Sequence, residues 1–186
     1  DWFLHARELE LDKNEEVGTG RHVWLEFMHV PVLYLPYFSF PLTEARKSGF
    51  LAPHFGHGDR TGFTFEVPYY FNIAPNLDDT LTPRVMTDRG LQLKNEFRYL
   101  TSTSTGIVLL EGLADDKKTG ETRSAAQFTH NQQFGRLWSG HAHARWVSDD
   151  NYFIDMEDGS GQTALTHLPR QLQINYGGPV VRFSGR

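Results

Sequence analysis

Apolar and polar residues alternate almost without interruption over residues 62–72. The apolar positions are Phe63, Phe65, Val67, Tyr69 and Phe71. The polar positions between them include Thr64, Glu66, Tyr70 and Asn72. A period of two residues is typical of a β-strand with one apolar and one polar face. We therefore expect a strand that turns its aromatic face toward an apolar environment.

Seven further segments of similar length follow, separated by turn residues. All the predicted strands of this region are 62–72, 78–88, 91–100, 106–113, 122–131, 136–148, 163–176 and 179–184. Strands of roughly 9–11 residues with this alternation are the signature of a transmembrane β-barrel. Trp138 and Trp146, near the two ends of one strand, fit the aromatic girdles of such a barrel. A soluble β-sandwich has the same alternation and remains an alternative.

The connections between these segments differ in length. Asp88-Arg89-Gly90 predicts a tight turn, whereas residues 114–121 and 148–162 predict long loops that are charged or rich in glycine. Short turns on one side and long loops on the other are typical of outer-membrane barrels.

Proline marks two regions of the chain. Residues 1–30 predict short strands, and residues 31–45 form a connector with prolines at Pro31, Pro36 and Pro41. So many prolines favour an edge strand or an extended linker. We expect this connector to pack near the barrel mouth through four aromatic residues: Tyr34, Tyr37, Phe38 and Phe40. Pro68 and Pro83 lie inside the first two long strands, where each removes a hydrogen-bond donor from the sheet.

Composition agrees with a turn-rich β protein. The chain has 186 residues, 13% of them aromatic, with 17 glycines and 9 prolines. No apolar run is long enough for a transmembrane helix, which needs about 18 residues. A net charge of −5 with interspersed signs argues against a nucleic-acid surface, and the absence of cysteine excludes disulfides and cysteine-based zinc sites within the chain. The opening DWFLHA is no signal peptide, and the chain ends within a strand pattern, so we expect a fragment of a longer protein.

The candidate catalytic and metal-binding groups are weak. His54 and His57 lie near Asp59, and His141 and His143 share one face of a predicted strand, but neither pair has a third ligand at a typical spacing. Asp78 and Asp79 are neighbours and so point to opposite faces of a strand. Ser160 lacks the spacing of a nucleophile elbow, and Gly18-Thr19-Gly20 lacks the strand–helix context of a phosphate loop. We predict no catalytic residues, no metal and no cofactor, and therefore a protein that is not an enzyme.

Several long strings resemble one family closely, the LPS-assembly outer-membrane proteins of the LptD or organic-solvent-tolerance (Imp) type. The matching strings are PVLYLPYFSFPL, RKSGFLAP, PYYFNIAPNLDDTLTP, RGLQLKNEFRYL and, more weakly, VSDDNYFIDM. The resemblance implies an all-β fold: the end of a periplasmic β-jellyroll in residues 1–45, then the first strands of a large antiparallel transmembrane β-barrel in residues 46–186. It implies lipopolysaccharide transport to the outer leaflet of the Gram-negative outer membrane, with the N-terminal part in the periplasm.

The resemblance also implies roles for particular residues. Pro68 and Pro83 match prolines held to weaken a lateral gate near the first barrel strands. The residues that would face lipid are Phe63, Phe65, Val67, Tyr69 and Phe71. Arg46, Lys47 and Arg84 are candidate contacts of lipid phosphates. The implied partners are lipopolysaccharide, an LptE-type plug lipoprotein and periplasmic bridge proteins that reach the jellyroll. Another outer-membrane channel of the porin type, or a soluble carbohydrate-binding β-sandwich, remains an alternative.

Overall fold

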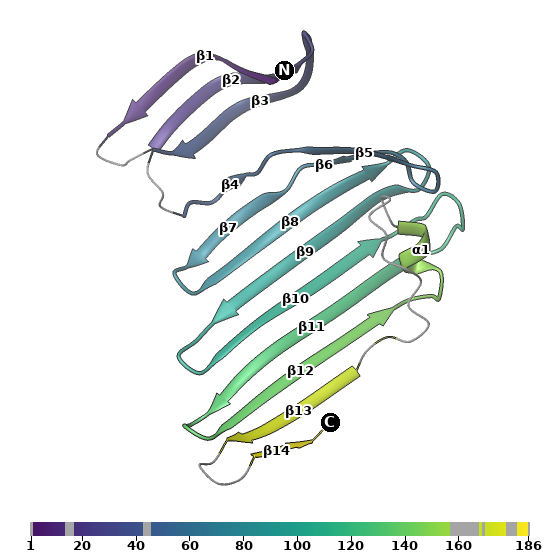
Figure 1. The fold of residues 1–186 in the computed structure, drawn as a ribbon. Helices are drawn as coiled ribbons and strands as arrows, with labels where there is room; N and C mark the ends of the chain where they lie inside the picture. The colour runs from purple at the N-terminus through teal and green to yellow at the C-terminus, as the bar shows by residue number, and fades with distance from the viewer. Residues whose placement is uncertain are drawn as a thin grey trace.

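The protein is almost entirely β-structure (Figure 1). A computed structural model describes residues 2–13, 17–42, 46–156, 168, 170–177 and 182–185. A three-stranded sheet holds β1 (Trp2–Asp12), β2 (Val17–Phe27) and β3 (Val30–Pro41). The remaining strands, which form an eleven-stranded sheet, are β4 (Gly49–Phe50), β5 (His54–Gly58), β6 (Gly62–Glu66), β7 (Tyr69–Ala74), β8 (Leu77–Met86), β9 (Gly90–Leu100), β10 (Ser104–Leu113), β11 (Arg123–Phe134), β12 (Trp138–Val147), β13 (Arg170–Gly177) and β14 (Arg182–Gly185). One short helix, α1 (Tyr152–Met156), follows β12, and no helix of the described residues is long and apolar enough to cross a membrane.

The three-stranded sheet ends at β3, which pairs only with β2 among the described strands. The edge-strand interpretation of the proline-rich connector is thus confirmed for residues 30–41. His22 adopts a left-handed conformation with φ of 48°. It lies at the level of Pro36, between the regular β2–β3 pairs Arg21–Tyr37 and Val23–Leu35. Proline offers no N–H to a ladder, and the register of the two strands has no regular pair at this position. The strands of residues 1–30 are longer than we expected.

The large sheet follows the order of the chain. From β14 back to β8, every strand is paired with its neighbour in sequence, which confirms the predicted antiparallel meander for the described residues. The predicted strand 62–72 is wrong in one respect, because it is divided into β6 and β7 at Val67 and Pro68. The sequence analysis also missed β4 and β5, which lie outside β6 and β7 at the edge of the sheet. An all-β fold is confirmed; within the described residues the sheet does not close, and its assignment to a jellyroll and a barrel stays a prediction.

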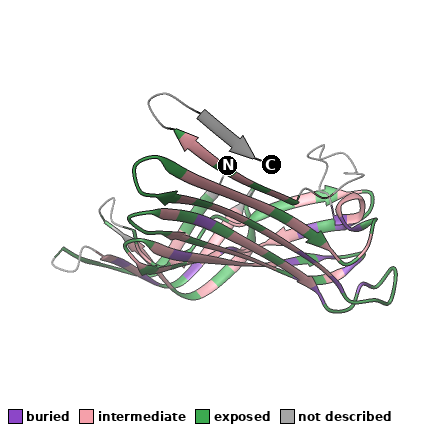
Figure 2. Cartoon of the chain, turned by 90° about the horizontal axis from the view of Figure 1, so that it is seen from below, coloured by how far each residue is buried: buried purple, intermediate pink, exposed green. Residues whose placement is uncertain are grey.

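The two faces of the large sheet differ in chemistry. Strand register places Phe65, Val85 and Leu91 on one face, which we term the apolar face. The large exposed apolar side chains of that face include Phe63, Val85, Leu91, Leu93, Leu110, Phe128, Trp146, Leu172 and Ile174. The opposite, polar face carries buried Thr64, Arg84 and Gln92. The sheet is a curved single layer, and none of the described strands forms a second sheet stacked on its apolar face, as a sandwich requires (Figure 2).

The connections at the two ends of the large sheet are unequal. Residues 75–76, 101–103 and 135–137 make short turns at one end, the short-turn end. The opposite, long-loop end carries residues 114–122 and the connection that contains α1. The tight turn at residues 87–89 also lies at the long-loop end, so the expectation that it lies on the opposite side was wrong.

The main buried core of the large sheet lies at the long-loop end, where α1 folds onto the polar face. Tyr152 and Met156 of α1 pack with a small apolar cluster that also contains Met86, Leu113 and Ala125. The Tyr152 hydroxyl donates to Glu111 Oε2 at 2.7 Å and accepts from Gln92 Nε2 at 2.9 Å.

A buried ionic cluster joins the connections around this core. Asp116, which is 0% exposed, accepts hydrogen bonds from Arg89 at 2.6 Å and Arg123 at 3.1 Å. Arg123 also binds both carboxylate oxygens of Asp149, at 2.6 and 2.9 Å, and Asp155 at 2.8 Å. The cluster links the connection 87–89, the connection 114–122 and the connection that contains α1 to the start of β11. Each charge in it has a partner of opposite sign, as a buried ion pair requires.

Candidate functional site

The interruption of the strand at Val67 and Pro68 is the most unusual feature of the large sheet. β6 and β7 keep a single register along β8, since Glu66 pairs with Arg84 and Tyr69 with Leu81 on either side of the gap. Leu51 N–H donates to the Pro68 carbonyl at 2.9 Å, and Val67 N–H donates to the Pro83 carbonyl at 3.3 Å.

In each of these two pairs the return hydrogen bond is missing, because proline has no N–H. Pro68 cannot donate toward Leu51, and Pro83 cannot donate toward Val67. The two deletions lie side by side on neighbouring strands, so they weaken two adjacent ladders at one level. The sequence analysis placed both prolines within the first two strands of the sheet. The structure instead places them one strand further in, with β4 and β5 outside them.

An apolar pocket of about 130 Å³ lies beside this interruption, between the two sheets. The three-stranded sheet contributes Leu4, Val23, Leu25, Leu33, Leu35 and Phe38. The edge of the large sheet contributes Phe50, Leu51, Ala52, Pro53 and Val67. All the described side chains that line it are apolar, so the pocket suits a hydrocarbon group.

A second, larger groove of about 500 Å³ lies on the polar face next to the interruption. Its wall combines Leu51 and Pro68 with charged side chains of β9 and β10: Lys94, Glu96, Arg98 and Glu111. Lys94 pairs with Glu66 at 3.2 Å, and Arg98 pairs with Asp78 at 2.6 Å.

Leu51 lines both hollows. One side of the interrupted strand therefore offers an apolar surface, and the other offers charged and hydrogen-bonding groups. This arrangement can hold an amphiphile, with its hydrocarbon part in the pocket and its polar part over the groove. We take the interruption and its two hollows as the candidate functional site.

The structure separates the four aromatic residues predicted for the connector. Phe38 lines the apolar pocket, and Phe40 stacks on it with ring centroids 5.9 Å apart. Tyr34 and Tyr37 are more than half exposed and line neither hollow. The role of all four in a lipid path stays a prediction.

The residues predicted to face lipid share one side of the strand at β6 and β7. Phe63 is 48% exposed and Phe71 is 38% exposed, while Phe65 and Tyr69 are half-buried by neighbouring rings. Val67 differs, because it lines the apolar pocket at the junction.

The three cations predicted to meet phosphate have different surroundings. Arg84 is 2% exposed, pairs with Glu66 at 2.9 Å and donates to the Met156 carbonyl at 2.9 Å. Its guanidinium is enclosed by the protein's own groups, so it is not accessible to a ligand in this conformation. Arg46 is exposed but already bonds Asp78 and Tyr70. Lys47 is half-buried.

Sequence reasoning missed the apolar residues that the fold gathers at the junction. Leu33 and Leu35 alternate within the connector, and Leu51-Ala52-Pro53 is a short apolar string before β5; both signals were available. What the sequence could not supply was the contact between them, which requires two sheets to meet. Among the described residues no group of His, Asp or Glu is arranged to hold a metal ion.

Comparisons with known proteins agree over nearly the whole chain. The family model described as LptD protein matches residues 19–138, and that of LPS transport system D matches residues 121–186. The LPS-assembly protein LptD of Pseudoalteromonas atlantica is 42% identical over 178 residues, which cover 95% of this chain and 24% of that protein. The LptD of Nitrosomonas europaea is 43% identical over 171 residues, covering 92% of this chain and 24% of that protein. The chain thus spans about a quarter of the length of these relatives.

Proposed function

This chain belongs to the LptD protein family, and we propose that its protein moves lipopolysaccharide into the outer leaflet of the Gram-negative outer membrane. Residues 1–45 would form the end of a periplasmic jellyroll, and residues 46–186 the first strands of a transmembrane barrel. The proposal assigns transport and insertion, with no bond made or broken by this chain.

One observation carries the proposal: an apolar pocket and a charged groove meet at Leu51 on an interrupted strand. Lipopolysaccharide combines acyl chains with a phosphorylated sugar head. Moving hydrocarbon through water costs about 0.8 kcal/mol for each CH₂ group. A junction whose apolar side joins two sheets spares the acyl chains that cost, while the head group keeps polar partners on the opposite face.

The lateral gate would use the same interruption. Each proline deletes one return hydrogen bond, and a hydrogen bond contributes about 0.5–1.5 kcal/mol net. Pro68 and Pro83 together would therefore lower the cost of separating the strands here by about 1–3 kcal/mol. A seam that opens sideways should be weakest at the point where the lipid arrives, and the apolar pocket, lined by Leu51 and Val67, lies beside both prolines.

The apolar face of the large sheet would contact the membrane. On β12, Trp138 and Trp146 are eight residues apart on this face, with exposed fractions of 44% and 48%. At about 3.4 Å per residue and the usual tilt of about 40°, the two rings would stand about 20 Å apart along the membrane normal, close to the height of a barrel's apolar band. The strands need no apolar helix to span a bilayer in this way.

The partners follow from the same proposal. An LptE-type lipoprotein would plug the barrel from the polar side, and periplasmic bridge proteins would deliver lipid through the jellyroll. We propose that the driving energy comes from outside this chain.

Site-specific crosslinking in cells tests the proposal. A photo-crosslinking amino acid at Leu51 or Phe38 of the full-length protein should capture lipopolysaccharide during transport. The matched control is Tyr34, which lies in the same strand as Phe38 but lines neither hollow. Equal capture at Tyr34 and Leu51, or capture at neither Leu51 nor Phe38, would refute the assigned path.

A further inference from the structure

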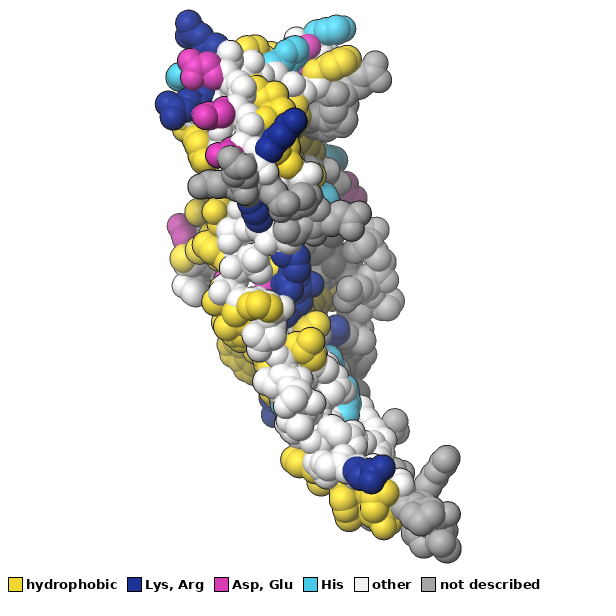
Figure 3. Space-filling view, turned by 90° about the vertical axis from the view of Figure 1, so that its left-hand side faces the viewer, with side chains coloured by type: hydrophobic (Ala, Val, Ile, Leu, Met, Phe, Trp, Pro, Cys, Tyr) yellow, Lys and Arg dark blue, Asp and Glu magenta, His cyan; other side chains and the backbone are white. Residues whose placement is uncertain are grey.

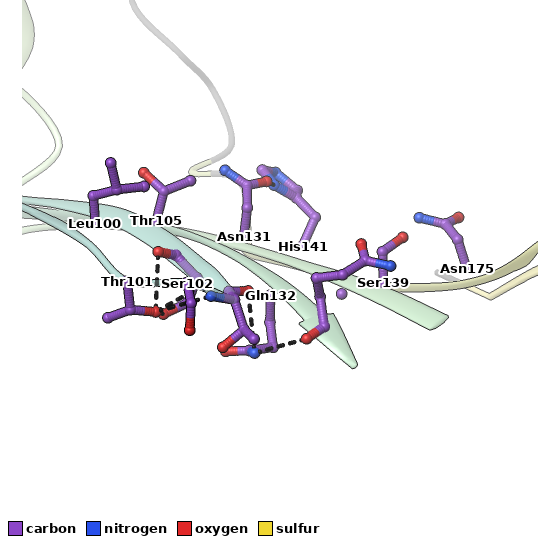
Figure 4. A pocket seen from close by; sticks show the side chains of 13 residues that line it. Leu100, Thr101, Ser102, Thr105, Asn131, Gln132, Ser139, His141 and Asn175 are labelled. Carbon is purple, nitrogen blue, oxygen red and sulfur yellow. Dashed lines mark hydrogen bonds between the residues drawn. The ribbon is translucent and has the colours of Figure 1, made fainter. Parts of the chain in front are cut away.

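Apolar side chains cover one side of the large sheet, as a membrane-facing surface requires. Seen toward the short-turn end, they gather along the left-hand side of the molecule (Figure 3). On the polar face at this end, hydroxyl and amide side chains line a hollow of about 380 Å³ over the ends of β9 to β13 (Figure 4). Polar side chains are ordinary there, because the inside of a barrel is polar. A charged group on the apolar face needs a separate explanation.

Asp79 is such a group. Its neighbour Asp78 lies on the polar face, where Arg98 pairs with it at 2.6 Å, so alternation turns Asp79 to the apolar face. Asp79 pairs in register with Phe71 of β7 on one side and with Phe97 of β9 on the other. Among the described strands of the large sheet, it is the one carboxylate on the apolar face. Ionisable residues within a membrane-spanning region are costly, and they usually mark a function.

Asn95 is the partner of Asp79 within the chain. Its Nδ2 donates to both carboxylate oxygens, at 2.7 and 2.9 Å. An amide has no net charge, and a carboxylate offers about four acceptor sites, so acceptor capacity remains. Arg170, the arginine that the described strands place on this face, belongs to β13, and four strands separate it from β8. Within the described strands, the carboxylate is thus held in position without a lysine or arginine beside it on its own face.

The position of Asp79 along its strand places it near one membrane interface. It is two residues from the start of β8 at Leu77, and Trp138 begins β12 at the same end of the sheet. With a rise of about 3.4 Å per residue and a tilt of about 40°, Asp79 would lie about 5 Å inside the strand ends. Tryptophan marks the level of lipid head groups, and the short turns of outer-membrane barrels face the periplasm. Asp79 would therefore meet the head groups of the inner leaflet, which is made of phospholipids.

We propose that Asp79 and Asn95 bind the primary ammonium head group of a phospholipid on the outside of the sheet. An ammonium has three N–H donors, so it can neutralise the carboxylate and fill its remaining acceptor sites. The acyl chains of the same lipid would lie over Phe71, Phe97 and the neighbouring apolar side chains. An anionic lipid without an ammonium would meet only repulsion from the carboxylate. The inference rests on the proposed function, since it takes the apolar face as the membrane surface.

The lipid site would lie next to the interruption of the strand. Phe71 belongs to β7, the part of the strand that follows Pro68. Asp79 belongs to β8, which pairs with both β6 and β7 across the interruption. A lipid held over β7, β8 and β9 would therefore cover the membrane side of the weakened pairing.

Lipid selectivity of the purified full-length protein tests the site. Native mass spectrometry from detergent measures retention of phosphatidylethanolamine against phosphatidylcholine with the same acyl chains, whose trimethylated ammonium has no N–H. The wild type should prefer the primary ammonium about tenfold, as expected for one charge-assisted hydrogen bond. Asp79→Asn should abolish this preference. The matched control, Asp59→Asn, should keep it, because Asp59 is an exposed carboxylate between β5 and β6 at the long-loop end.

Three results would overturn the proposal. The first is equal retention of the two lipids by the wild type, which requires no variant to fold. The second is a preference that persists in Asp79→Asn or is lost equally in Asp59→Asn. The third comes from a photo-crosslinker at Phe71, which should capture phospholipid in cells; capture of a protein alone would make this surface a protein interface. Capture of lipopolysaccharide at Leu51 reports the proposed function separately, because transport can succeed without a head-group preference and fail with one.

Discussion

The buried ionic cluster at the long-loop end leads us to predict a loss of local stability in the variant Asp116→Asn. Asp116 is fully buried and receives hydrogen bonds from Arg89, Arg123 and the backbone N–H of Lys118. Removing one member of a buried ion pair costs about 3–5 kcal/mol. Here both arginines keep other carboxylate partners, so we expect a somewhat smaller loss than that, about 2–4 kcal/mol of local stability.

The effect should depend on pH with a defined sign. Burial alone would raise the pKa of Asp116, but hydrogen bonds from the Lys118 N–H, Arg123 and Arg89, with the positive charge of Arg89, outweigh it and lower the pKa below 3.8. A carboxyl whose folded pKa is lowered stabilises the fold fully above its unfolded pKa. That stability is lost as pH falls through the folded value. The difference between wild type and variant should thus be complete at pH 7 and shrink below pH 3.8.

Limited proteolysis of the folded full-length protein measures this local stability. Trypsin cleaves after Lys117 and Lys118 when the connection 114–122 opens, and a loss of about 2–4 kcal/mol raises the open population about 30- to 1000-fold. Asp115→Asn is the matched control, because Asp115 is the neighbouring carboxylate and is exposed. The reasoning is refuted if Asp116→Asn keeps wild-type protection at pH 7, or if Asp115→Asn loses as much. Urea unfolding across acid pH checks the sign.

Three further predictions concern the helix, the apolar face and the gate. Tyr152→Phe removes a hydroxyl with two hydrogen-bond partners and should destabilise the docking of α1 by about 0.5–1.5 kcal/mol. We expect faster proteolysis within the helix, while the unheated full-length protein keeps its wild-type migration on SDS gels. Gly106→Ala places a methyl group 2.3 Å from a tyrosine ring of β9, whereas Gly112→Ala in the same strand meets nothing within 4 Å, so only the first should lower the melting temperature. Replacing Pro68 and Pro83 together by alanine should restore two hydrogen bonds and reduce lipopolysaccharide at the cell surface more than either single change. Normal surface lipopolysaccharide and normal antibiotic exclusion in cells with the double variant would show that the prolines only interrupt strands.

Side-chain alternation predicted the strands of this protein well because each strand of a single-layer sheet has two different environments. β9 shows this most clearly: Leu91 and Leu93 face one side, and Gln92 and Lys94 face the other, as their order in the sequence requires. Where the environment changes along a strand, the prediction failed. Val67 belongs to the apolar series by position, yet it lies at a break caused by the next residue, and it lines a pocket instead of the open face.

The missed strands have a different cause. β5 contains His54, Gly56, His57 and Gly58, with little side-chain preference for a strand, and it forms because β6 offers it a complementary edge. A sequence pattern records a residue's own preference, not the partner that tertiary structure supplies. For the same reason Arg84 was expected to be open to phosphate. Its burial depends on α1, which is about 70 residues away in the sequence but adjacent in space.

The position of the weak pairing, one strand inside the edge, changes how a gate would work. If the prolines lay on the outermost strand, opening would require only loss of contact with a closing strand. Here β4 and β5 lie outside the strand that carries Pro68. Each of the pairs Leu51–Pro68 and Val67–Pro83 keeps one hydrogen bond and lacks the return bond, and both pairs lie within this chain. In the proposed gate, the edge would bend outward at residues 51–53 and leave the longer ladder between β8 and β9 intact. Such a hinge would open the apolar pocket toward the membrane while the charged groove kept its shape. This predicts that a crosslink between residues 51 and 68 blocks lipid release, whereas a crosslink between β8 and β9 does not.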